Sequence, residues 1–417
     1  MKIVCVGGGP AGLYFAISAK LRNPGHDLTV IERNRAGVTY GWGVTFSDPL
    51  LDTLYRNDPE SARRILDNPA SWHNQEVSVG ATKRAHLGGY GYAIGRKHLL
   101  DILVDRAMEL GVHVQFEREI GDLSEFTDAD LIVACDGVNS RIRRLHAQHF
   151  GTDAVVCRNK YLWLGTKKIF ESFMFVFEET PAGWIWFYSY PYNAETTTFI
   201  VECSPETWTG LGFDVLRSDE SLKKLEEIFA HHLDGHRLMN SKRDLGKIPW
   251  LNFIRITNTS WHHGKIVLMG DAAHTTHFSI GSGTTLAMQD AVGLADSLEA
   301  HDDLQAALAH YEQQRRADIM DLQNAAVNST EWFENVPSYI DEPITQFAYS
   351  LWKRRGRHPR WRYHLHLATQ FSPVRRLRQE LSALRNGLRA QQRMKLANVS
   401  PEAYPDLDVR TRSVRVQ

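Results

Sequence analysis

The sequence predicts an α/β protein in which a mostly parallel sheet with helices is interlocked with an antiparallel sheet and followed by a helical extension. Three observations predict this fold. The chain opens on a strand, a glycine turn, a helix and a second strand. Aromatic and β-branched runs separated by turns then fill residues 161–203. Helix and strand alternation returns from residue 265, so the first unit is discontinuous in sequence.

The parallel unit is predicted from buried apolar runs and helical apolar faces. Residues 3–6 and 28–31 are apolar strands on either side of a helix over 11–21, which makes a βαβ unit. A helix over 99–110 precedes strands over 112–116 and 130–134. A strand over 265–269 and helices over 286–298 and 304–328 close the unit, which we place at residues 1–75, 95–160 and 260–345.

The antiparallel unit and the extension have a different composition. Strands and turns predict a second domain from residues 76–94 and 161–259, with a charged helical stretch at 221–232. Residues 346–417 are predicted to be a basic helical extension, broken near Pro359 and Pro373. From Leu351 onward there are 16 Lys or Arg against 4 Asp or Glu, although the whole chain has a net charge of -1. That overall charge gives no attraction to nucleic acid or to an anionic membrane.

Cysteine spacing and hydropathy indicate in which cellular compartment the protein is expected. Cys5, Cys135, Cys157 and Cys203 show no CxxC spacing, so we expect reduced thiols and no metal. The N-terminal apolar run is too short for a signal peptide, and no segment approaches the ~20 apolar residues of a membrane span. We expect a cytoplasmic protein.

The glycine loop at residues 7–12 predicts a dinucleotide site. Gly7 allows the tight turn, Gly9 lets backbone approach a pyrophosphate, and Gly12 lies where helix meets strand. The helix begins at the loop, so its free amide groups and positive dipole end favour phosphate. Glu32 ends the second strand and can accept from a ribose hydroxyl, which favours FAD or NAD over NADP. The predicted site also includes Pro10, Ala11 and Arg33.

Two further motifs narrow the cofactor to a flavin. CDGVNSRIR spans residues 135–143, and GDAAHTTHFSIGSGTTLAMQDA spans residues 270–291. With the glycine loop, they resemble in kind and order the three markers of the single-component flavin hydroxylases related to p-hydroxybenzoate hydroxylase. The resemblance covers residues 1 to about 330. It implies a glutathione-reductase-like Rossmann FAD domain, with NADH or NADPH as co-substrate.

The resemblance also implies roles for single residues. Asp271 would bind the FAD ribityl chain, and Arg96 would lie near the FAD backbone. Gly281 and Gly283 would let backbone lie against the isoalloxazine ring, and the helix beginning near Thr284 and Thr285 would point amides at the flavin. Asp136 and Ser140 would shape the region shared by FAD and nicotinamide, although an Asp after a strand is often only a helix cap. The implied cofactor set is completed by Gly41 and Trp42.

Four strings resemble one branch of this family: HFSIGSGTT, GWGV (41–44), RNKYLWLGT (158–166) and TFIVECSPETW (198–208). That branch contains salicylyl-CoA 5-hydroxylase, the hydroxylase half of 2-aminobenzoyl-CoA monooxygenase/reductase and the violacein-pathway tryptophan hydroxylase. The chain departs from many relatives at His277 and Phe278, where two prolines are common, and at Thr285, where Asn is frequent. The implied reaction reduces the flavin, adds O2 at C4a, and transfers a hydroxyl from the hydroperoxide to an aromatic ring.

Catalytic and substrate residues are hypotheses at this stage. His277, beside Phe278, could take a phenolic proton or relay one from the hydroperoxide, since imidazole titrates near neutrality; a structural role is the alternative. Trp184, Trp186 and Tyr188 alternate along a strand and could line an aromatic pocket or pack in the core. Arginines from 354 to 378 could bind the phosphates of CoA, with Arg354 and Arg375 as candidates. A solvated or subunit-contacting helix is the alternative.

The leading hypothesis is hydroxylation of salicylyl-CoA to gentisyl-CoA by a monomer or homodimer, with neither nucleic acid nor membrane as partner. Tryptophan or another free aromatic compound is the alternative substrate. A flavin halogenase matches half of its GWxWxIP motif at residues 183–186, but Tyr188 and Ser189 replace the Ile-Pro. A noncatalytic carrier with a related nucleotide fold would be colourless, and the second and third markers argue against it.

Overall fold

A six-stranded sheet forms the first unit of the computed structural model, which describes residues 1–67, 69–241, 249–356, 359 and 361–396. All neighbouring strands are parallel except the pair at one edge, β16 and β17. The order across the sheet is β16 (His262–His263), β17 (Ile266–Leu268), β9 (Leu131–Ala134), β1 (Lys2–Val6), β2 (Asp27–Ile31) and β8 (His113–Gln115).

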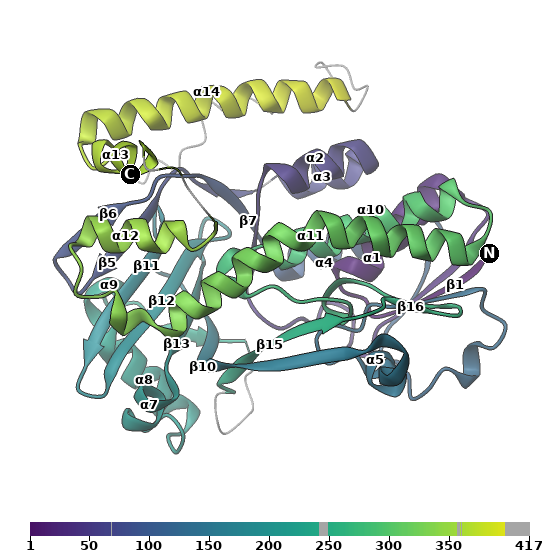
Figure 1. The fold of residues 1–417 in the computed structure, drawn as a ribbon, viewed down its shortest axis with the longest axis horizontal. Helices are drawn as coiled ribbons and strands as arrows, with labels where there is room; N and C mark the ends of the chain where they lie inside the picture. Colours follow the sequence, from purple (N-terminus) through teal and green to yellow (C-terminus); the bar gives the residue numbers. More distant parts are fainter. Residues whose placement is uncertain (68, 242–248, 357–358, 360, 397–417) are drawn as a thin grey trace.

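Four long helices accompany this sheet (Figure 1). Helices α1 and α10 pack against each other, and α11 continues from α10 toward the second sheet. Leu13, Phe15 and Ile17 of α1 are fully buried, and every residue from Pro10 to Ala19 is buried, so α1 is a core helix surrounded by protein on all sides. The predicted strands and helices of this unit are confirmed. The four are α1 (Pro10–Arg22), α4 (Arg96–Glu109), α10 (Gly283–Ala300) and α11 (Leu304–Glu334).

An eight-stranded sheet forms the second unit. It is antiparallel except for β5 and β11, which pair in parallel. Its order is β14 (Leu238–Asn240), β10 (Thr152–Thr166), β13 (Thr197–Cys203), β12 (Gly183–Pro191), β11 (Phe173–Thr180), β5 (Gln75–Val79) and β6 (Lys83–His86), and β15 (Leu251–Asn258) pairs with β10. A separate three-stranded sheet, absent from the sequence prediction, contains β3 (Gly43–Phe46), β7 (Gly91–Gly95) and β4 (Ala70–Trp72).

Strand β10 joins the two units and crosses the domain boundary that the sequence suggested at residue 160. Its first half pairs with β15, and its second half pairs with β13 and β14. The register with β15 shifts between Val156 and Lys160, where a bulge bends the strand. In Figure 1 the strand runs from the second sheet toward α5.

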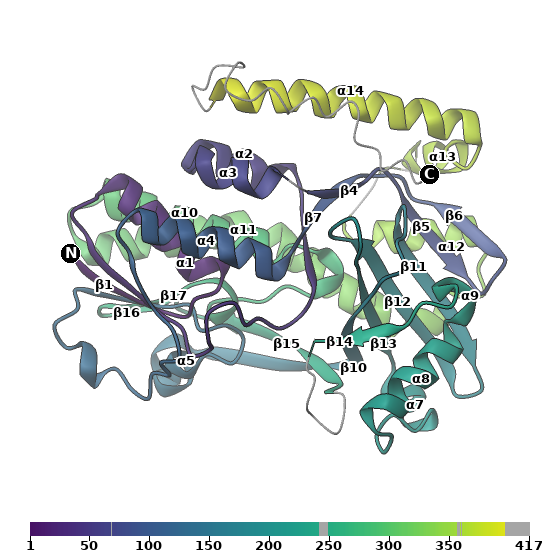
Figure 2. The same cartoon turned by 180° about the vertical axis from the view of Figure 1, so that it is seen from behind.

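The described part of the C-terminal segment, up to residue 396, forms three helices, with breaks near Pro359 and just before Pro373. Helix α12 (Ile344–Lys353) is not a surface extension, because Phe347 and Leu351 are buried in the core of the second sheet. Helices α13 (Trp361–Ala368) and α14 (Ser372–Leu396) lie outside that core, with α14 along the outer edge (Figure 2). Residues 397–417 of the predicted extension lie outside the described residues.

Helix α14 is held on the molecule by ion pairs to α2 (Asp48–Asn57). Arg389 Nη1 lies 2.5 Å from Asp48 Oδ2, and Arg393 Nε lies 2.6 Å from Asp52 Oδ1. Arg393 also donates to Asp48 Oδ1 at 2.7 Å. The basic helix therefore contacts the acidic body.

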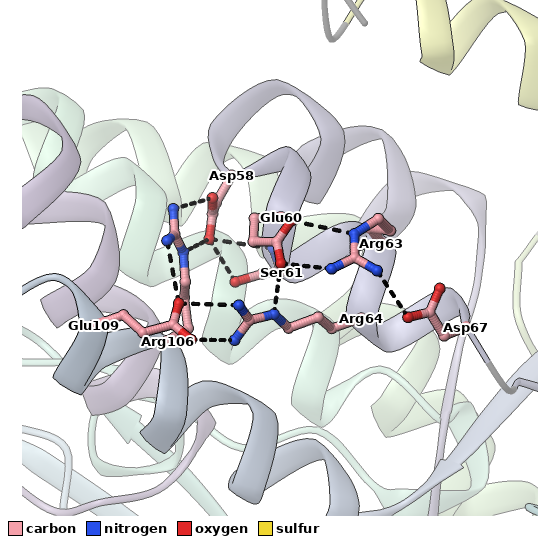
Figure 3. A network of polar contacts seen from close by, with 8 residues as sticks. All are labelled: Asp58, Glu60, Ser61, Arg63, Arg64, Asp67, Arg106 and Glu109. Carbon is pink, nitrogen blue, oxygen red and sulfur yellow. Dashed lines mark hydrogen bonds and ion pairs between the residues drawn. The ribbon is translucent and has the colours of Figure 1, made fainter. Parts of the chain in front are cut away.

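A polar network links α3 (Pro59–Leu66) to α4 (Figure 3). Arg106 donates to both carboxylate oxygens of Asp58 at 3.0 Å, and Asp58 is almost fully buried. Arg64 binds Glu109 through two bonds of 2.9 and 3.0 Å. These contacts fix the helical layer beside the first sheet.

The remaining elements are short. The α-helices are α5 (Arg141–Leu145), α6 (Ala147–Phe150), α7 (Pro205–Gly210), α8 (Ser218–Ile228) and α9 (Ala230–Leu233). The 3-10 turns are η1 (Ser124–Phe126), η2 (Gly270–Ala272), η3 (Phe278–Ile280) and η4 (Val336–Ser338). Within the described ranges, no helix has both the length and the apolar character needed to cross a bilayer.

Candidate active site

The glycine loop joins β1 to α1 and leaves one side of the helix start open. Gly7 has φ +123°, and a Cβ on Gly12 would lie 2.2 Å from the Gly7 carbonyl oxygen. By contrast, no atom lies within 4 Å of a Cβ placed on Gly9. Pro10 and Ala11 form the first turn of α1 just beyond it. The loop therefore offers free amides and open space to a phosphate group.

Glu32 ties this loop to the end of β2. Its Oε2 accepts from the Gly8 amide at 2.8 Å, and its Oε1 accepts from the Asn34 amide at 2.8 Å. Oε1 also accepts from Asn34 Nδ2 at 2.6 Å, so Oε2 is the oxygen that keeps a second lone pair for a ribose hydroxyl. Arg33 is exposed beside it.

The segment after β9 contains helix caps and one arginine that the sequence reasoning missed. Asp136 Oδ2 accepts from the Arg141 amide at 2.6 Å, and Ser140 Oγ accepts from the Arg143 amide at 3.0 Å. Asp136 Oδ1 is buried and has no hydrogen-bond partner within the described chain. Arg143 donates to the Ala272 carbonyl oxygen at 3.0 Å, so it joins two of the three markers. The position of Arg143 within the CDGVNSRIR motif could have identified it from the sequence.

Two charged side chains from distant segments lie near the glycine loop. Burial lowers the pKa of Arg96, and the charges of Asp271 and Glu32 oppose that shift. Burial raises the pKa of Asp271, and His274, Arg96 and Arg143 oppose it. Arg96 Nε also donates to Thr39 Oγ1 at 3.0 Å.

Both of these side chains keep contact with solvent although protein surrounds them: Asp271 is exposed and Arg96 is half-buried. An acid and a base at the edge of the open glycine loop suit the ribityl hydroxyls and the phosphates of FAD.

The loop between η2 and α10 provides the side of the proposed FAD site that lies opposite the glycine loop. Gly281 has φ +70°, and a Cβ there would lie 2.7 Å from Thr45 Oγ1. Helix α10 begins at Gly283, where a Cβ would have nothing within 4 Å, so the amides of Thr284 and Thr285 are in an open first turn. Such a helix end stabilises negative charge, as on a reduced flavin. The residues present therefore fit FAD.

Gly41 and Trp42 precede β3 and pack against β10. Gly41 has φ +91°, and a Cβ there would lie 2.7 Å from the Trp163 ring. A Cβ on Gly165 would lie 2.6 Å from the Trp42 ring. Each tryptophan therefore needs a glycine opposite it, which fixes the GWGV segment against the second sheet.

A buried ion network anchors the loop between η2 and α10. Asp290 Oδ2 lies 2.7 Å from His274 Nε2 and 3.2 Å from the Gly270 amide, and Asp290 Oδ1 accepts from Arg315 Nε at 2.9 Å. Burial alone would raise the pKa of Asp290, but His274 and Arg315 lower it. The loop is thus attached to both α10 and α11.

A cavity of about 550 Å³ opens between β10, β15 and α11. Val155 and Val156, which are exposed, line it together with Phe253 and His277. Arg255 also lines it, is half-buried, and has no ion-pair partner among the described residues. A volume of this size suits a small-molecule ligand. Sequence reasoning missed Arg255, because neither a motif nor a charge cluster marks it.

His277 stands where the cavity meets a narrow adjoining crevice. The Ser279 amide donates to His277 Nδ1 at 3.4 Å, and Ser279 Oγ lies 2.7 Å from the same atom. An amide can only donate, so Nδ1 is the acceptor and the proton of the neutral ring is on Nε2. Burial lowers the pKa of His277 to about 3, and Arg354 adds to the shift. The lowered pKa argues against the expectation that His277 titrates near neutrality.

Arg354 supports this histidine and is not available to CoA. Its Nε donates to Ser329 Oγ at 2.9 Å, and its Nη2 donates to the Ser279 carbonyl oxygen at 3.0 Å. Ser329 Oγ in turn lies 2.7 Å from Ser279 Oγ. The guanidinium is buried between the Phe175 and Phe333 rings. The prediction that Arg354 binds a CoA phosphate fails because its donors and its surface are occupied by protein.

The adjoining crevice contains a buried acid. Glu202 Oε1 accepts from Asn159 Nδ2 at 2.7 Å, and the Tyr188 hydroxyl donates to Glu202 Oε2. Burial raises the pKa of Glu202 to about 7, although both donors oppose the shift. Phe278 lies 4.7 Å from Tyr161 and 5.8 Å from Tyr188 between ring centroids, and the crevice has no room for water. Glu202 was missed because the strand pairing that buries it is not visible in sequence.

The other predicted substrate residues lie away from the cavity. Trp184 and Trp186 belong to the core between the second sheet and α11 and α12, so core packing, the alternative reading, describes them. The Tyr188 ring contacts the Phe278 ring, and its hydroxyl donates to Glu202. Arg375 lines a separate small crevice beside α14. Trp186 Nε1 donates to the Tyr188 hydroxyl at 3.1 Å, so both residues join the buried acid Glu202 of the crevice that His277 and Phe278 line. Trp184 and Arg375 lie elsewhere.

A dinucleotide cradle that fits FAD and a cavity at the junction of two sheets are features of a flavin-dependent enzyme. Residues 123–326 match the family described as "FAD binding domain". The chain belongs to the FAD-dependent aromatic hydroxylases, which use NAD(P)H as co-substrate, and the predicted family is confirmed.

Two relatives resemble most of the chain. It is 41% identical to salicyloyl-CoA 5-hydroxylase of Streptomyces sp, over 84% of this chain and 69% of the relative. It is 35% identical to 3-hydroxy-4-methyl-anthranilyl-[aryl-carrier protein] 5-monooxygenase of Streptosporangium sibiricum, over 90% of this chain and 100% of the relative.

Solved structures share the fold. The tetrameric form of 2-methyl-3-hydroxypyridine-5-carboxylic acid oxygenase superimposes with a TM-score of 0.66 at 21% identity, over 85% of this chain and 95% of that one. At this identity the likeness supports the fold alone.

Proposed function

We propose that the protein hydroxylates an electron-rich aromatic ring presented as a thioester, with salicylyl-CoA converted to gentisyl-CoA as the leading reaction. The observation that carries this proposal is the open cavity beside His277, which has room for a ring and part of a long acyl arm. The two relatives support it, since one is named for a CoA substrate and the other for a carrier-bound one.

FAD, when bound, supplies the redox chemistry that activates O2 for transfer to the ring. The chain must bind the ring, orient it and exclude water. Phe253 and the exposed Val155 and Val156 provide apolar surface for these tasks. Glu32, Arg96 and Asp271 are the proposed contacts to the cofactor, together with the open first turns of α1 and α10.

His277 and Glu202 give the inner end of the cavity one donor and one acceptor. His277 Nε2 can donate to an oxygen of the substrate, and Glu202 can accept from a ring hydroxyl once Phe278 moves aside. A salicylyl group has a carbonyl oxygen beside a ring hydroxyl, so it matches both. A carboxylate that accepts from this hydroxyl raises the electron density of the ring, which favours electrophilic hydroxylation.

The test is substrate-stimulated NAD(P)H oxidation with identification of the product. Salicylyl-CoA, 2-aminobenzoyl-CoA, salicylyl-pantetheine, free salicylate and tryptophan are compared at equal concentration. We expect the CoA ester to give the highest kcat/KM and a hydroxylated thioester. Preference for free salicylate or tryptophan would reject the thioester assignment, and preference for the pantetheine ester over the CoA ester would favour a carrier-bound substrate.

Arg255 is the proposed contact for the thioester arm. Arg255→Gln removes the half-buried cation from the cavity wall, so KM for the CoA ester should rise about tenfold, as expected for one hydrogen bond to a charged group. The kcat value should change little, because Arg255 binds the arm and not the reacting ring. Steady-state kinetics on the CoA ester measures both.

Arg375→Gln is the matched control, since this arginine lines a different crevice. Its KM should stay at the wild-type value. If Arg255→Gln and wild type had the same KM, Arg255 would not contact the thioester arm. If Arg375→Gln raised KM, the prediction that Arg375 binds CoA would be supported instead.

A further inference from the structure

Helix α14 carries an apolar stripe that faces away from the body. Its members are Val374, Leu377, Leu381, Leu384 and Leu388, which we call the α14 seam. They are 38, 57, 58, 64 and 62% exposed. Single exposed hydrophobic residues are ordinary, but a contiguous row of this kind marks a binding surface.

The opposite face of α14 is the one that contacts the body. Gln379, Asn386 and Arg393 are seven residues apart, and Asn386 and Arg393 are buried. Gln379 lines the small crevice beside β5 and β6, and Arg393 binds Asp48 and Asp52. Because these three residues share one helix face, the seam is on the outside. In Figures 1 and 2 α14 forms the outer edge of the molecule in both views.

The spacing of the seam identifies the kind of surface that covers it. Steps of three, four, three and four residues are the a and d positions of a heptad repeat, which place side chains into the holes of a second helix. A helix that packs on a globular surface usually needs a broader apolar face. The seam is therefore suited to one long helix with the same repeat.

The charges beside the seam complement a second copy of the helix. With Leu381 and Leu388 at position a, Glu380 is at position g and Arg385 is at position e. In two parallel helices, g of one lies beside e five residues later in the other. Glu380 of each copy would therefore meet Arg385 of its partner, twice around the two-fold axis. Both residues are exposed in the single chain.

The last 21 residues are a poorer occupant on sequence grounds. Residues 397–417 contain Pro401 and Pro405, and their apolar residues do not repeat every three and four positions. Proline within the segment also opposes a continuous helix.

We propose that two copies of this chain associate through parallel pairing of their α14 seams. The interface is short, about two heptads, so the dimer should form in the micromolar range and be sensitive to single changes. None of the residues that line the cavity belongs to α14, so association should leave turnover unchanged. This inference is independent of the proposed substrate.

The first experiment measures mass by light scattering after gel filtration of the full chain at several concentrations. Wild type should approach twice the chain mass of 47.5 kDa. The double variant Leu381→Glu, Leu384→Glu should be monomeric, with a dissociation constant raised about 100-fold or more. Val215→Glu, which charges an exposed apolar residue elsewhere, should stay dimeric. A monomeric wild type, or a dimeric seam variant, would overturn the proposal.

The second experiment tests the partner and the direction of the helices. Glu380→Arg and Arg385→Glu should each weaken the dimer, and the two together should restore it. Failure of this rescue would overturn parallel pairing. Deleting residues 397–417 should leave the dimer intact; if wild type is monomeric and the deletion dimerises, the tail covers the seam instead. Circular dichroism and turnover on the substrate verify that each variant is folded.

Discussion

His277 shows how the neighbours of a side chain decide what it can do. The sequence suggests a base because imidazole ordinarily titrates near neutrality. The Ser279 amide holds Nδ1 as an acceptor. Burial, with a smaller contribution from the charge of Arg354, lowers the pKa of the ring and keeps it neutral. The other nitrogen of the neutral ring, Nε2, is then an N–H donor.

Substitutions at His277 distinguish a donor from a base. His277→Gln can still donate, so it should keep within about tenfold of wild-type kcat/KM. His277→Phe cannot donate and should lose about 100-fold, with reduced flavin oxidised without product. Product formed per NAD(P)H consumed is the measurement that separates these variants.

If His277 were instead a base, kcat would fall as pH drops through its titration. The low pKa of His277 predicts no such step between pH 5 and 9 from this residue. Loss of a pH step in His277→Gln would contradict the donor role.

Sequence reasoning at the level of single residues worked where a motif fixes the backbone. The loop at residues 7–12 and the segment at 270–291 could be located because glycine spacing constrains their turns. Glu202 and Arg255 could not, since the face that a strand residue presents depends on which strands pair and in what register. Arg354 was misplaced for a related reason: a cluster of arginines in sequence does not reveal which member turns inward.

At the level of elements, the contact between α3 and α4 depends on one buried pair. Arg106 makes two bonds to Asp58, which also accepts from Ser61 and is almost fully buried. Removing the arginine leaves that carboxylate without its cation. An unpaired buried charge costs far more than a broken surface pair.

Arg106→Leu should therefore lower the free energy of unfolding by about 3–5 kcal/mol. Urea denaturation followed by circular dichroism measures it. Arg35→Leu is the control: the pair of Arg35 with Glu117 is exposed, and its loss should change stability by less than about 1 kcal/mol. Equal effects for the two variants would show that burial does not govern this network.

The elements themselves were predicted more completely than their connections. Continuous apolar runs located β1, β2, β9 and β17, because strands buried on both faces leave such runs, and apolar patterns located α1, α10 and α11. The two-residue edge strand β16 is too short to leave a signal. The three-stranded sheet and the parallel pairing of β5 with β11 depend on contacts between distant segments. A boundary at residue 160 was expected from composition, but β10 continues through it because both halves find pairing partners.

For the whole molecule, Glu202 links stability to pH. Its native pKa of about 7 lies above the ordinary value of 4.5, so the folded protein holds a proton that the unfolded chain has lost in this window. Stability from this residue is therefore fully present below pH 4.5 and is lost as pH rises through about 7.

The effect on the free energy of unfolding is up to about 3 kcal/mol, because each tenfold change in proton affinity corresponds to about 1.4 kcal/mol. Glu202→Gln cannot ionise, so its free energy of unfolding should fall less between pH 5 and 8 than that of wild type. Urea denaturation at both pH values gives the difference. If the free energy of unfolding changed equally with pH in Glu202→Gln and wild type, Glu202 would have its ordinary pKa.

Strand β10 has a consequence for any attempt to divide the protein. Its 15 residues supply hydrogen bonds to β15 at one end and to β13 and β14 at the other, and the cavity wall lies between them. A gene fragment ending near residue 160 would therefore leave one sheet with an unpaired edge and the other without a strand. A chimera of two related enzymes should therefore fold only if all of β10 comes from one of them. The ends of β10 are the positions at which the two sequences can be joined.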